Sequence, residues 1–352
     1  SDTLSLISKP IEKDMKQFQG LFSELLSHND GLLHDVLQHI MKRGGKRMRP
    51  MLTLLIARAL YTQEHGEMYR DFKKLCNVVG SGDKQLIQKA LYAACSLELL
   101  HTASLVHDDV VDEADERRGQ QSVNASYTNR IAILVCDYIL SASLKAISEC
   151  ADQRMTNGIA RLGLTLSEGE VRQIQNISDK AFSIDAYYDV IGKKTAALFE
   201  ACCAIGTLSG GAPEEEIENA KMFGRNLGMI FQIRDDIFDY YDQSEIGKPT
   251  GNDMAEGKLT LPVIYAVNSA NDPEMTSLAF KVKDHTASQD EIARLVAFAK
   301  EHGGIEYAEQ RMEQLHAEAV ALLDSISCNA PVIVSDGSFG ASAVKAALMA
   351  YL

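Results

Sequence analysis

Apolar residues recur at intervals of three and four along most of the 352-residue chain, the spacing that gives an α-helix one apolar face. The clearest of these stretches are Leu91–Val111, Ala132–Ile147, Gly158–Ile174 and Met222–Tyr240. Breakers such as Gly44-Gly45 separate the helical stretches, and no stretch alternates apolar and polar residues as a half-buried strand would. The pattern therefore predicts an all-α fold, with residues 1–352 forming a single domain.

Composition predicts a soluble protein that does not bind nucleic acid. The residues are 46% hydrophobic and 24% charged, which is typical of globular proteins. The formal net charge of −14 disfavours nucleic acid as a partner, because a phosphate backbone requires a basic surface. No signal peptide or transmembrane segment is expected, since no apolar run approaches the length that a membrane span needs.

The seven cysteines favour a cytoplasmic location. Their number is odd and no C-x-x-C pair occurs, so the sequence indicates neither a disulfide framework nor a zinc site. We expect reduced thiols within a helical core.

An aspartate-rich cluster, Asp108-Asp109-Val110-Val111-Asp112, ends the helix that begins near Leu91. Asp108 and Asp112 are four residues apart, so they share one helix face and repel each other. A bound cation would remove that repulsion. Carboxylates without His or Cys partners favour Mg²⁺, which commonly completes its shell with water and substrate phosphate. The cluster is therefore a candidate magnesium site.

A second cluster, Asp235-Asp236-Ile237-Phe238-Asp239, repeats the same spacing in another apolar helix. A single cluster of this kind could equally be an acidic patch on a solvated surface. Two copies inside apolar helices are harder to explain in that way, because buried carboxylates are costly unless a metal or a base neutralises them. The pair of clusters predicts a site for metal and anion.

Basic residues lie next to glycines near both clusters, where an anionic substrate would need them. Each group alone would be typical of a solvated surface, but glycine lets the backbone bring cations close to phosphate oxygens. The groups are Gly44-Gly45-Lys46-Arg47-Met48-Arg49, Arg117-Arg118-Gly119, Lys193-Lys194, Lys248 and Lys258.

Five motifs occur in an order and at a spacing that resemble the trans-isoprenyl (polyprenyl) diphosphate synthases, and in particular their long-chain, octaprenyl-like branch. The motifs are GGKRMRP (44–50), HTASLVHDDVVDEADERRG (101–119), KKTAALFE (193–200), FQIRDDIFDYYD (231–242) and GKPTGNDMAEGKLTLPVIYA (247–266). The resemblance, whose core is 44–266, implies the isoprenoid synthase fold, a bundle of about ten or more helices around a central cavity. It also implies a homodimer.

The resemblance assigns roles to individual residues. It implies three Mg²⁺ ions per site, with Asp108, Asp112, Asp235 and Asp239 as metal ligands, and it counts Asp109, Asp236 and Lys194 among the catalytic residues. Isopentenyl diphosphate would be bound by Lys46, Arg49, His101 and Arg118. The allylic diphosphate, such as farnesyl diphosphate, would be bound by Arg117, Lys194, Thr195, Gln232, Lys248 and Lys258.

The implied reaction is ionisation of the allylic diphosphate, condensation with isopentenyl diphosphate and loss of a proton. Short-chain members of the family place a bulky aromatic residue at one of the positions of Ala103 and Ser104, where it floors the product cavity. Both residues are small here, and Leu100 lies one turn deeper. We therefore expect a product of six or more isoprene units, such as the octaprenyl diphosphate used for quinone side chains. Small residues also serve close helix packing, so the residue that floors the cavity is left open.

Three alternatives stay open at this point. A farnesyl or geranylgeranyl diphosphate synthase would use the same site for a shorter product. Class I terpene cyclases usually keep only one aspartate cluster, and non-catalytic synthase subunits tend to lose one or both, so the two intact clusters argue against these classes. The connection at 61–82 is longer and more polar than in most of the family, and its role is not assigned.

Overall fold

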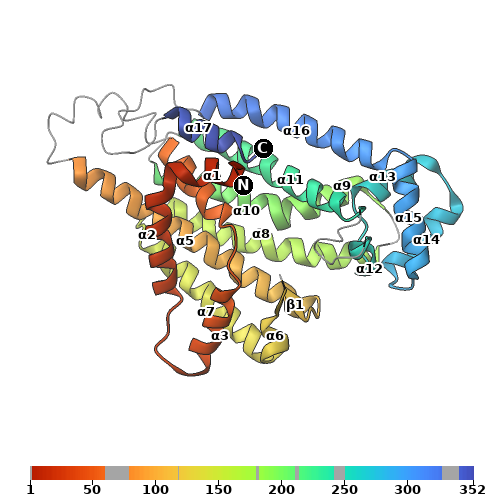
Figure 1. Ribbon diagram of the computed structural model, residues 1–352, viewed down its shortest axis with the longest axis horizontal. Coiled ribbons are helices and arrows are strands. Elements are labelled where there is room, and N and C mark those ends of the chain that lie inside the picture. Colours follow the sequence, from red (N-terminus) through yellow and green to blue (C-terminus); the bar gives the residue numbers. More distant parts are fainter. Residues whose placement is uncertain are drawn as a thin grey trace. The chain divides into compact units, whose positions relative to one another are not determined.

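The structure is a computed structural model that describes residues 2–59, 79–117, 119–179, 182–210, 214–241, 250–326 and 341–352. Helices account for almost all of this part of the chain, and the two-residue strands β1 (Glu116–Arg117) and β2 (Gln120–Gln121) form its only sheet, an antiparallel pair (Figure 1). The all-α prediction is confirmed. Arg118, Lys248 and most of the 61–82 connection lie outside the described residues.

The first half of the chain supplies the helices around the first aspartate cluster. Their bounds are α1 (Asp2–Ser8), η1 (Lys9–Ile11), α2 (Glu12–Leu25), α3 (Gly31–Lys42), a helical segment at 48–59, α5 (Val79–Val111), α6 (Val123–Ser126), α7 (Asn129–Ser148) and α8 (Gln153–Ser178). The second half follows with α9 (Ile184–Ile191), the π-helical turn η2 (Gly192–Ala196), α10 (Ala197–Ser209), α11 (Glu214–Phe238), α12 (Asn252–Ala255), α13 (Leu261–Ala270), α14 (Pro273–Lys283), α15 (Gln289–Glu301), α16 (Gly304–Ile326) and α17 (Ala341–Met349).

Contacts within the chain group its residues into two compact units. Unit 1 comprises Ser1–Gly163, Leu198–Gly224 and Leu322–Leu352, and unit 2 comprises Leu164–Ala197 and Arg225–Ala321. The boundaries fall inside α8, α11 and α16. The first aspartate cluster belongs to unit 1 and the second to unit 2.

Within unit 1, α5 and α7 pack along each other through small residues. Ser96 and Ser143 are both fully buried, and each hydroxyl donates to the backbone carbonyl of the other residue at 2.8 Å. Further along the same contact, Cys136 Sγ donates to the Ala103 carbonyl at 3.5 Å. Small side chains with satisfied polar groups let two helix backbones approach closely, which fixes the position of the end of α5 that bears the first cluster.

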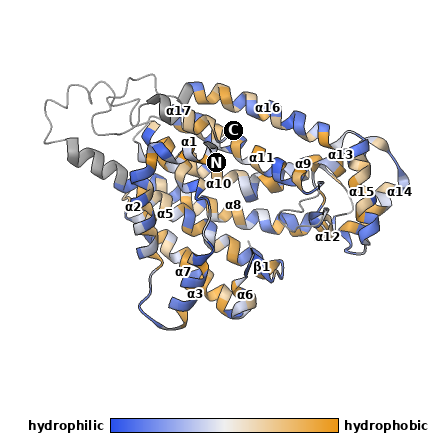
Figure 2. Ribbon diagram, viewed as in Figure 1, coloured by the Kyte–Doolittle hydropathy of each residue, from blue (hydrophilic) through white to orange (hydrophobic). Residues whose placement is uncertain are grey.

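Helix α7 also exposes apolar residues. By length and composition it is the one helix in the described residues that could cross a membrane, with a mean hydropathy of 1.7, although the sequence predicts no such span. Residues such as Val135 and Ile139 face the core, whereas Ile133, Leu134 and Leu144 are exposed. Figure 2 shows that the helices of the protein carry both apolar and polar residues. Unit 1 therefore presents an apolar surface on α7.

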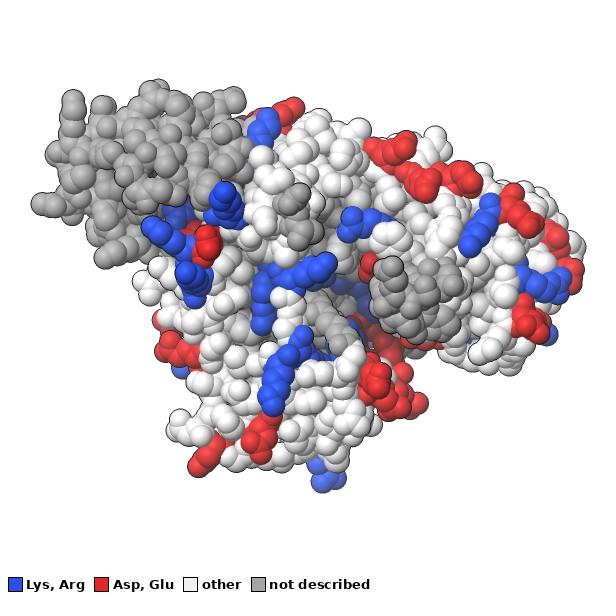
Figure 3. Space-filling model, viewed as in Figure 1, with Lys and Arg blue, Asp and Glu red and all other residues white. Residues whose placement is uncertain are grey.

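The five cysteines in the described residues are buried and free: Cys95, Cys136, Cys150, Cys202 and Cys203. Burial raises the pKa of the Cys136 and Cys202 thiols to about 12. These side chains act as small apolar residues of a helical core, as the sequence predicts. On the surface, the face drawn in Figure 3 carries both acidic and basic side chains.

Candidate active site

The first aspartate cluster lies at the C-terminal end of α5. Asp108 is half-buried and Asp112 is exposed, and the Asp112 amide donates to the Asp108 carbonyl at 2.8 Å, so the two residues are one helical turn apart. No group of three or more His, Cys, Asp or Glu side chains suited to a metal occurs in the described part of the chain. Two carboxylates that reach solvent one turn apart fit Mg²⁺ whose remaining ligands are water and substrate phosphate.

Asp109 has different surroundings although it lies between these two residues. It is 1% exposed, and its Oδ1 accepts hydrogen bonds from Arg117 Nε at 2.8 Å and pairs with Arg117 Nη2 at 2.8 Å. Arg43 Nη1 lies 3.7 Å from its Oδ2. Burial raises the pKa of the Asp109 carboxyl, and Arg117 and Arg43 oppose that shift. Asp109 therefore faces guanidinium groups inside unit 1.

A small cavity of about 50 Å³ lies in unit 1 beside this cluster. Of the residues predicted to bind isopentenyl diphosphate, His101 lines this cavity. Lys46 and Arg49 do not line it. Lys46 is exposed, and the Arg49 guanidinium lies 4.9 Å from the centre of the Phe199 ring. The structure thus brings together only part of the predicted set in this cavity.

The second cluster ends α11 in unit 2. Asp235 is exposed, Asp236 is 6% exposed, and Asp239 is half-buried just past the helix. The two carboxylate oxygens of Asp239 accept the backbone amides of Asn252 and Asp253, each at 3.1 Å. Asp239 therefore fixes the start of the short helix α12 as well as being a predicted metal ligand, and its oxygens keep further lone pairs for a cation.

Asp236 is held by a chain of hydrogen bonds that are buried or partly buried. The Tyr187 hydroxyl donates to Asp236 Oδ2, and Gln232 Nε2 donates to Asp236 Oδ1 at 2.8 Å. Thr195 Oγ1 donates to Gln232 Oε1 at 2.9 Å, which fixes the amide so that its NH₂ faces Asp236. Burial is the main cause that raises the pKa of Asp236 to about 8, with Asp253 and Asp235 adding to it. Thr195 and Gln232 therefore orient an aspartate of the cluster.

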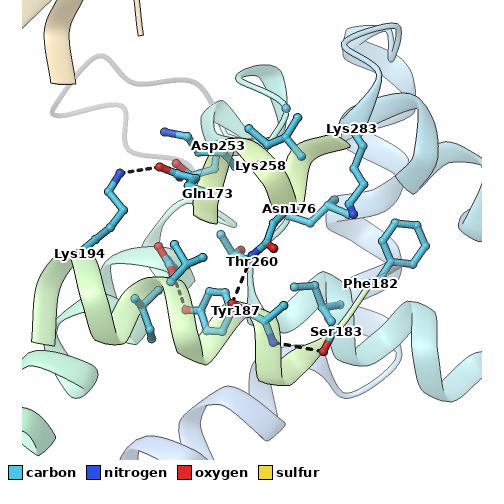
Figure 4. A pocket seen from close by; sticks show the side chains of 18 of the residues that line it. Gln173, Asn176, Phe182, Ser183, Tyr187, Lys194, Asp253, Lys258, Thr260 and Lys283 are labelled. Carbon is cyan, nitrogen blue, oxygen red and sulfur yellow. Dashed lines mark hydrogen bonds between the residues drawn. The ribbon is translucent and has the colours of Figure 1, made fainter. Parts of the chain in front are cut away.

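Figure 4 shows the larger cavity of unit 2, of about 280 Å³, into which Lys194, Lys258 and Tyr187 point. Lys194 lies on the π-helical turn η2, a rare element that frequently marks functional sites. Its Nζ donates to Gln173 Oε1 at 2.5 Å and pairs with Glu170 at 2.7 Å. Four residues predicted for the allylic diphosphate line this one cavity: Lys194, Thr195, Gln232 and Lys258.

The residues predicted to set product length lie on α5. Leu100 and Ala103 are 5% and 2% exposed, and Ala103 lies at the contact with α7. Ser104 is half-buried and donates to the His101 carbonyl at 2.7 Å. Of the two small positions, Ser104 is therefore the one that a larger side chain could extend from without first separating α5 from α7.

The sequence does not reveal Tyr187 or Arg43 as site residues. Tyr187 lies on an amphipathic helix, where a buried aromatic residue is ordinarily part of the core. Arg43 follows α3 among other basic residues and has no distinguishing spacing. The only sequence signal for a role in the site was that Tyr187 lies close to Lys194, and Arg43 next to Gly44, both of which belong to motifs.

Replacing Tyr187 with phenylalanine is expected to lower kcat by about tenfold while changing the melting temperature little. The ring would still fill the core, but Asp236 would lose one of two hydrogen bonds, worth roughly 1–2 kcal/mol. The half-saturating Mg²⁺ concentration should rise in parallel, which a purely structural role would not cause.

The matched control for this variant is Tyr188→Phe. Tyr188 is the next residue, and its ring lies 5.6 Å from the Arg311 guanidinium. Its substitution should leave the magnesium dependence as in the wild type. Equal losses of melting temperature and activity in Tyr187→Phe, with unchanged magnesium dependence, would contradict the positioning role.

Comparison with known proteins gives the chain its family. The sequence model described as polyprenyl synthetase matches residues 30–299. Heptaprenyl diphosphate synthase component 2 of Geobacillus stearothermophilus is 31% identical over 94% of this chain and 91% of its own length. Octaprenyl diphosphate synthase of Escherichia coli is also 31% identical, over 91% of this chain and 92% of its own.

Solved structures agree with this result. A geranylgeranyl pyrophosphate synthase from Bacteroides thetaiotaomicron superposes with a TM-score of 0.77 at 41% identity, covering 100% of this chain and 98% of that one. A decaprenyl diphosphate synthase from Rhodobacter capsulatus superposes with a TM-score of 0.77 at 32% identity, covering 90% and 91%. The resemblance seen in the five motifs is confirmed, as is the isoprenoid synthase fold: the chain belongs to the polyprenyl synthetase family.

Proposed function

We propose that the protein is a magnesium-dependent trans-polyprenyl diphosphate synthase, which condenses isopentenyl diphosphate with an allylic diphosphate. It is a prenyltransferase of the polyprenyl synthetase family. The observation that carries the proposal is that both aspartate clusters are intact and that each places two carboxylates one turn apart at the end of a long helix. Terpene cyclases and non-catalytic subunits do not need both clusters together with the cation sets.

The family implies a divalent metal, and we assign it as Mg²⁺, with three ions per site. The candidate ligands are Asp108 and Asp112 in unit 1 and Asp235 and Asp239 in unit 2, because all four are solvent-accessible oxygen donors. When bound, the metal draws electron density toward the leaving diphosphate and so favours cleavage of the allylic C–O bond.

The residues of the chain bind and orient the two substrates. Lys194 and Lys258 line the unit 2 cavity and supply positive charge to the allylic diphosphate there. The family motifs assign Lys248 and Arg117 to the same substrate. Thr195 and Gln232 keep Asp236 in place beside it. Lys46, Arg49, His101 and Arg118 bind isopentenyl diphosphate. Holding the two reactants in a fixed orientation is a large part of catalysis in a condensation of this kind.

The product is a long-chain all-trans polyprenyl diphosphate, in the range of octaprenyl, that serves as a quinone side chain. Ala103 and Ser104 are small where short-chain members of the family carry an aromatic residue, and the heptaprenyl and octaprenyl relatives support this length. A geranylgeranyl product is the second candidate, favoured by the 41% identical structure from Bacteroides thetaiotaomicron. The two candidates share every step except where elongation stops.

The enzyme acts as a homodimer in the cytoplasm. The exposed apolar residues Ile133, Leu134 and Leu144 on α7 would be covered by a second copy, since apolar patches of this kind mark protein interfaces. Buried, free thiols fit a reducing compartment.

An elongation assay tests the proposal. The purified protein with Mg²⁺, radiolabelled isopentenyl diphosphate and farnesyl diphosphate should form labelled products, and chelation of the metal should stop their formation. Chromatography of the dephosphorylated product distinguishes a long-chain product of six or more isoprene units from a geranylgeranyl product of four. Hydrocarbon made from farnesyl diphosphate alone would indicate a cyclase, and an absence of elongated product, with or without a partner subunit, would sink the proposal.

A further inference from the structure

Three arginines line the small cavity of unit 1: Arg43, Arg47 and Arg117. Arg43 ends α3 as its C-cap residue, Arg47 lies in the following segment with a backbone φ of 54°, and Arg117 lies in β1. Guanidinium groups stay charged at every relevant pH. Sequence segments far apart in the chain thus converge to give this cavity a positive wall.

Two carboxylates counter part of this charge. Arg47 Nη1 lies 2.8 Å from Glu98 Oε1, and Arg117 forms a two-pronged contact with Asp109 Oδ1. Three guanidinium groups thus face two carboxylates, which leaves an excess of positive charge before His101 is counted. Such a surplus in a cavity favours an anionic ligand.

Asp109 connects two of the arginines. Its side chain is 2% exposed, and its Oδ2 lies 3.7 Å from Arg43 Nη1 without accepting a hydrogen bond from any described residue. The Arg43 side chain is 8% exposed and donates to the Gln121 carbonyl at 3.3 Å. A carboxylate this buried must be compensated by charge, so Asp109 keeps both guanidinium groups beside the cavity.

We propose that Arg43 is a further binding residue for the diphosphate of isopentenyl diphosphate and that Asp109, which also holds Arg117, positions Arg43 for it. The inference rests on the proposed function. Arginine binds phosphate oxygens with two parallel donors, and its contacts strengthen where water is partly excluded. Lys46 and Arg49 do not line this cavity, whereas Arg43 does.

Polar and apolar residues share the wall of this small cavity. Its volume is about 50 Å³, and apolar residues such as Phe22, Leu26 and Ile40 share its wall with the arginines. His101, already predicted for isopentenyl diphosphate, lies on it. The residues predicted for the allylic diphosphate that line the cavity of unit 2 are Lys194, Thr195, Gln232 and Lys258.

Steady-state kinetics with both substrates varied in turn test this inference. Arg43→Ala should raise the KM for isopentenyl diphosphate about tenfold or more, because a charge-assisted phosphate contact is lost, and leave the KM for farnesyl diphosphate within about twofold. Calorimetric binding of isopentenyl diphosphate should weaken by the same factor. Lys42→Ala removes the preceding, exposed cation and serves as the matched control, with both KM values unchanged.

Arg43→Lys keeps the positive charge but loses the two parallel donors of the guanidinium group, so it should raise the KM for isopentenyl diphosphate about threefold or more. This variant tests the inference if Arg43→Ala does not fold. Unchanged KM values in both variants, or equal rises for both substrates, would overturn the inference. Failure of the proposed function has a different signature, because the wild-type protein would then elongate no allylic primer at all.

Discussion

Replacing Asp108 with alanine is expected to lower kcat by about a thousandfold or more, because the proposed metal site would lose a ligand that stabilises charge as the allylic bond breaks. Asp108 is half-buried at the end of α5, so its loss leaves no large cavity and should keep the fold. The measurement is kcat with isopentenyl and farnesyl diphosphates at saturating Mg²⁺. Thermal unfolding with and without Mg²⁺ and inorganic pyrophosphate supplies a second readout, in which the stabilisation by ligand should disappear.

The control for Asp108→Ala is Asp115→Ala. Asp115 is an exposed aspartate a few residues past the first cluster, and its backbone carbonyl accepts a hydrogen bond from the Ser122 amide. This variant should keep full activity and the full response to Mg²⁺ and pyrophosphate. Wild-type activity in Asp108→Ala would remove the metal-site assignment.

Replacing Ser104 with phenylalanine is expected to shorten the product by several isoprene units while keeping turnover within about fivefold. Ser104 lies four residues before Asp108, roughly 6 Å along the helix, and it is half-buried, so an aromatic ring can extend from it. Ala103 in contrast lies at the contact with α7, where a ring would force the two helices apart. Chromatography of the dephosphorylated products gives the chain-length distribution.

Ser141→Phe is the matched control for the Ser104 variant. Ser141 is exposed on α7, so a ring there should leave the product length unchanged. An unaltered product from Ser104→Phe, in an enzyme with normal turnover, would place the floor of the cavity elsewhere.

Local spacing in the sequence was sufficient to predict the helices and both aspartate clusters. The period of apolar residues along Leu91–Val111 predicts a helix, and α5 spans Val79–Val111. The four-residue spacing of Asp108 and Asp112 places them one turn apart in the structure, since an α-helix repeats every 3.6 residues. Such inferences succeed because they depend only on neighbours in the chain.

Only the family resemblance separated Asp109 and Asp236 from the other members of each cluster; the residue spacing did not show how their surroundings differ. Asp109 faces Arg117, eight residues away, and Arg43 of a different helix, while Asp236 receives a hydrogen bond from Tyr187, 49 residues away. Burial and a long-range partner set Asp109 and Asp236 apart from the solvent-accessible carboxylates of each cluster. Neither property appears in a local pattern.

The sequence by itself thus determined the all-α class and the family, and it predicted most of the residues to which we assign the chemistry. Only the tertiary structure decided that Asp109 and Asp236 are buried and held by Arg117 and Tyr187, and that Arg43 lines the cavity beside His101. The physical reason is that helix formation and motif spacing depend on short segments of chain. The environment of a side chain depends on which distant segments pack against it.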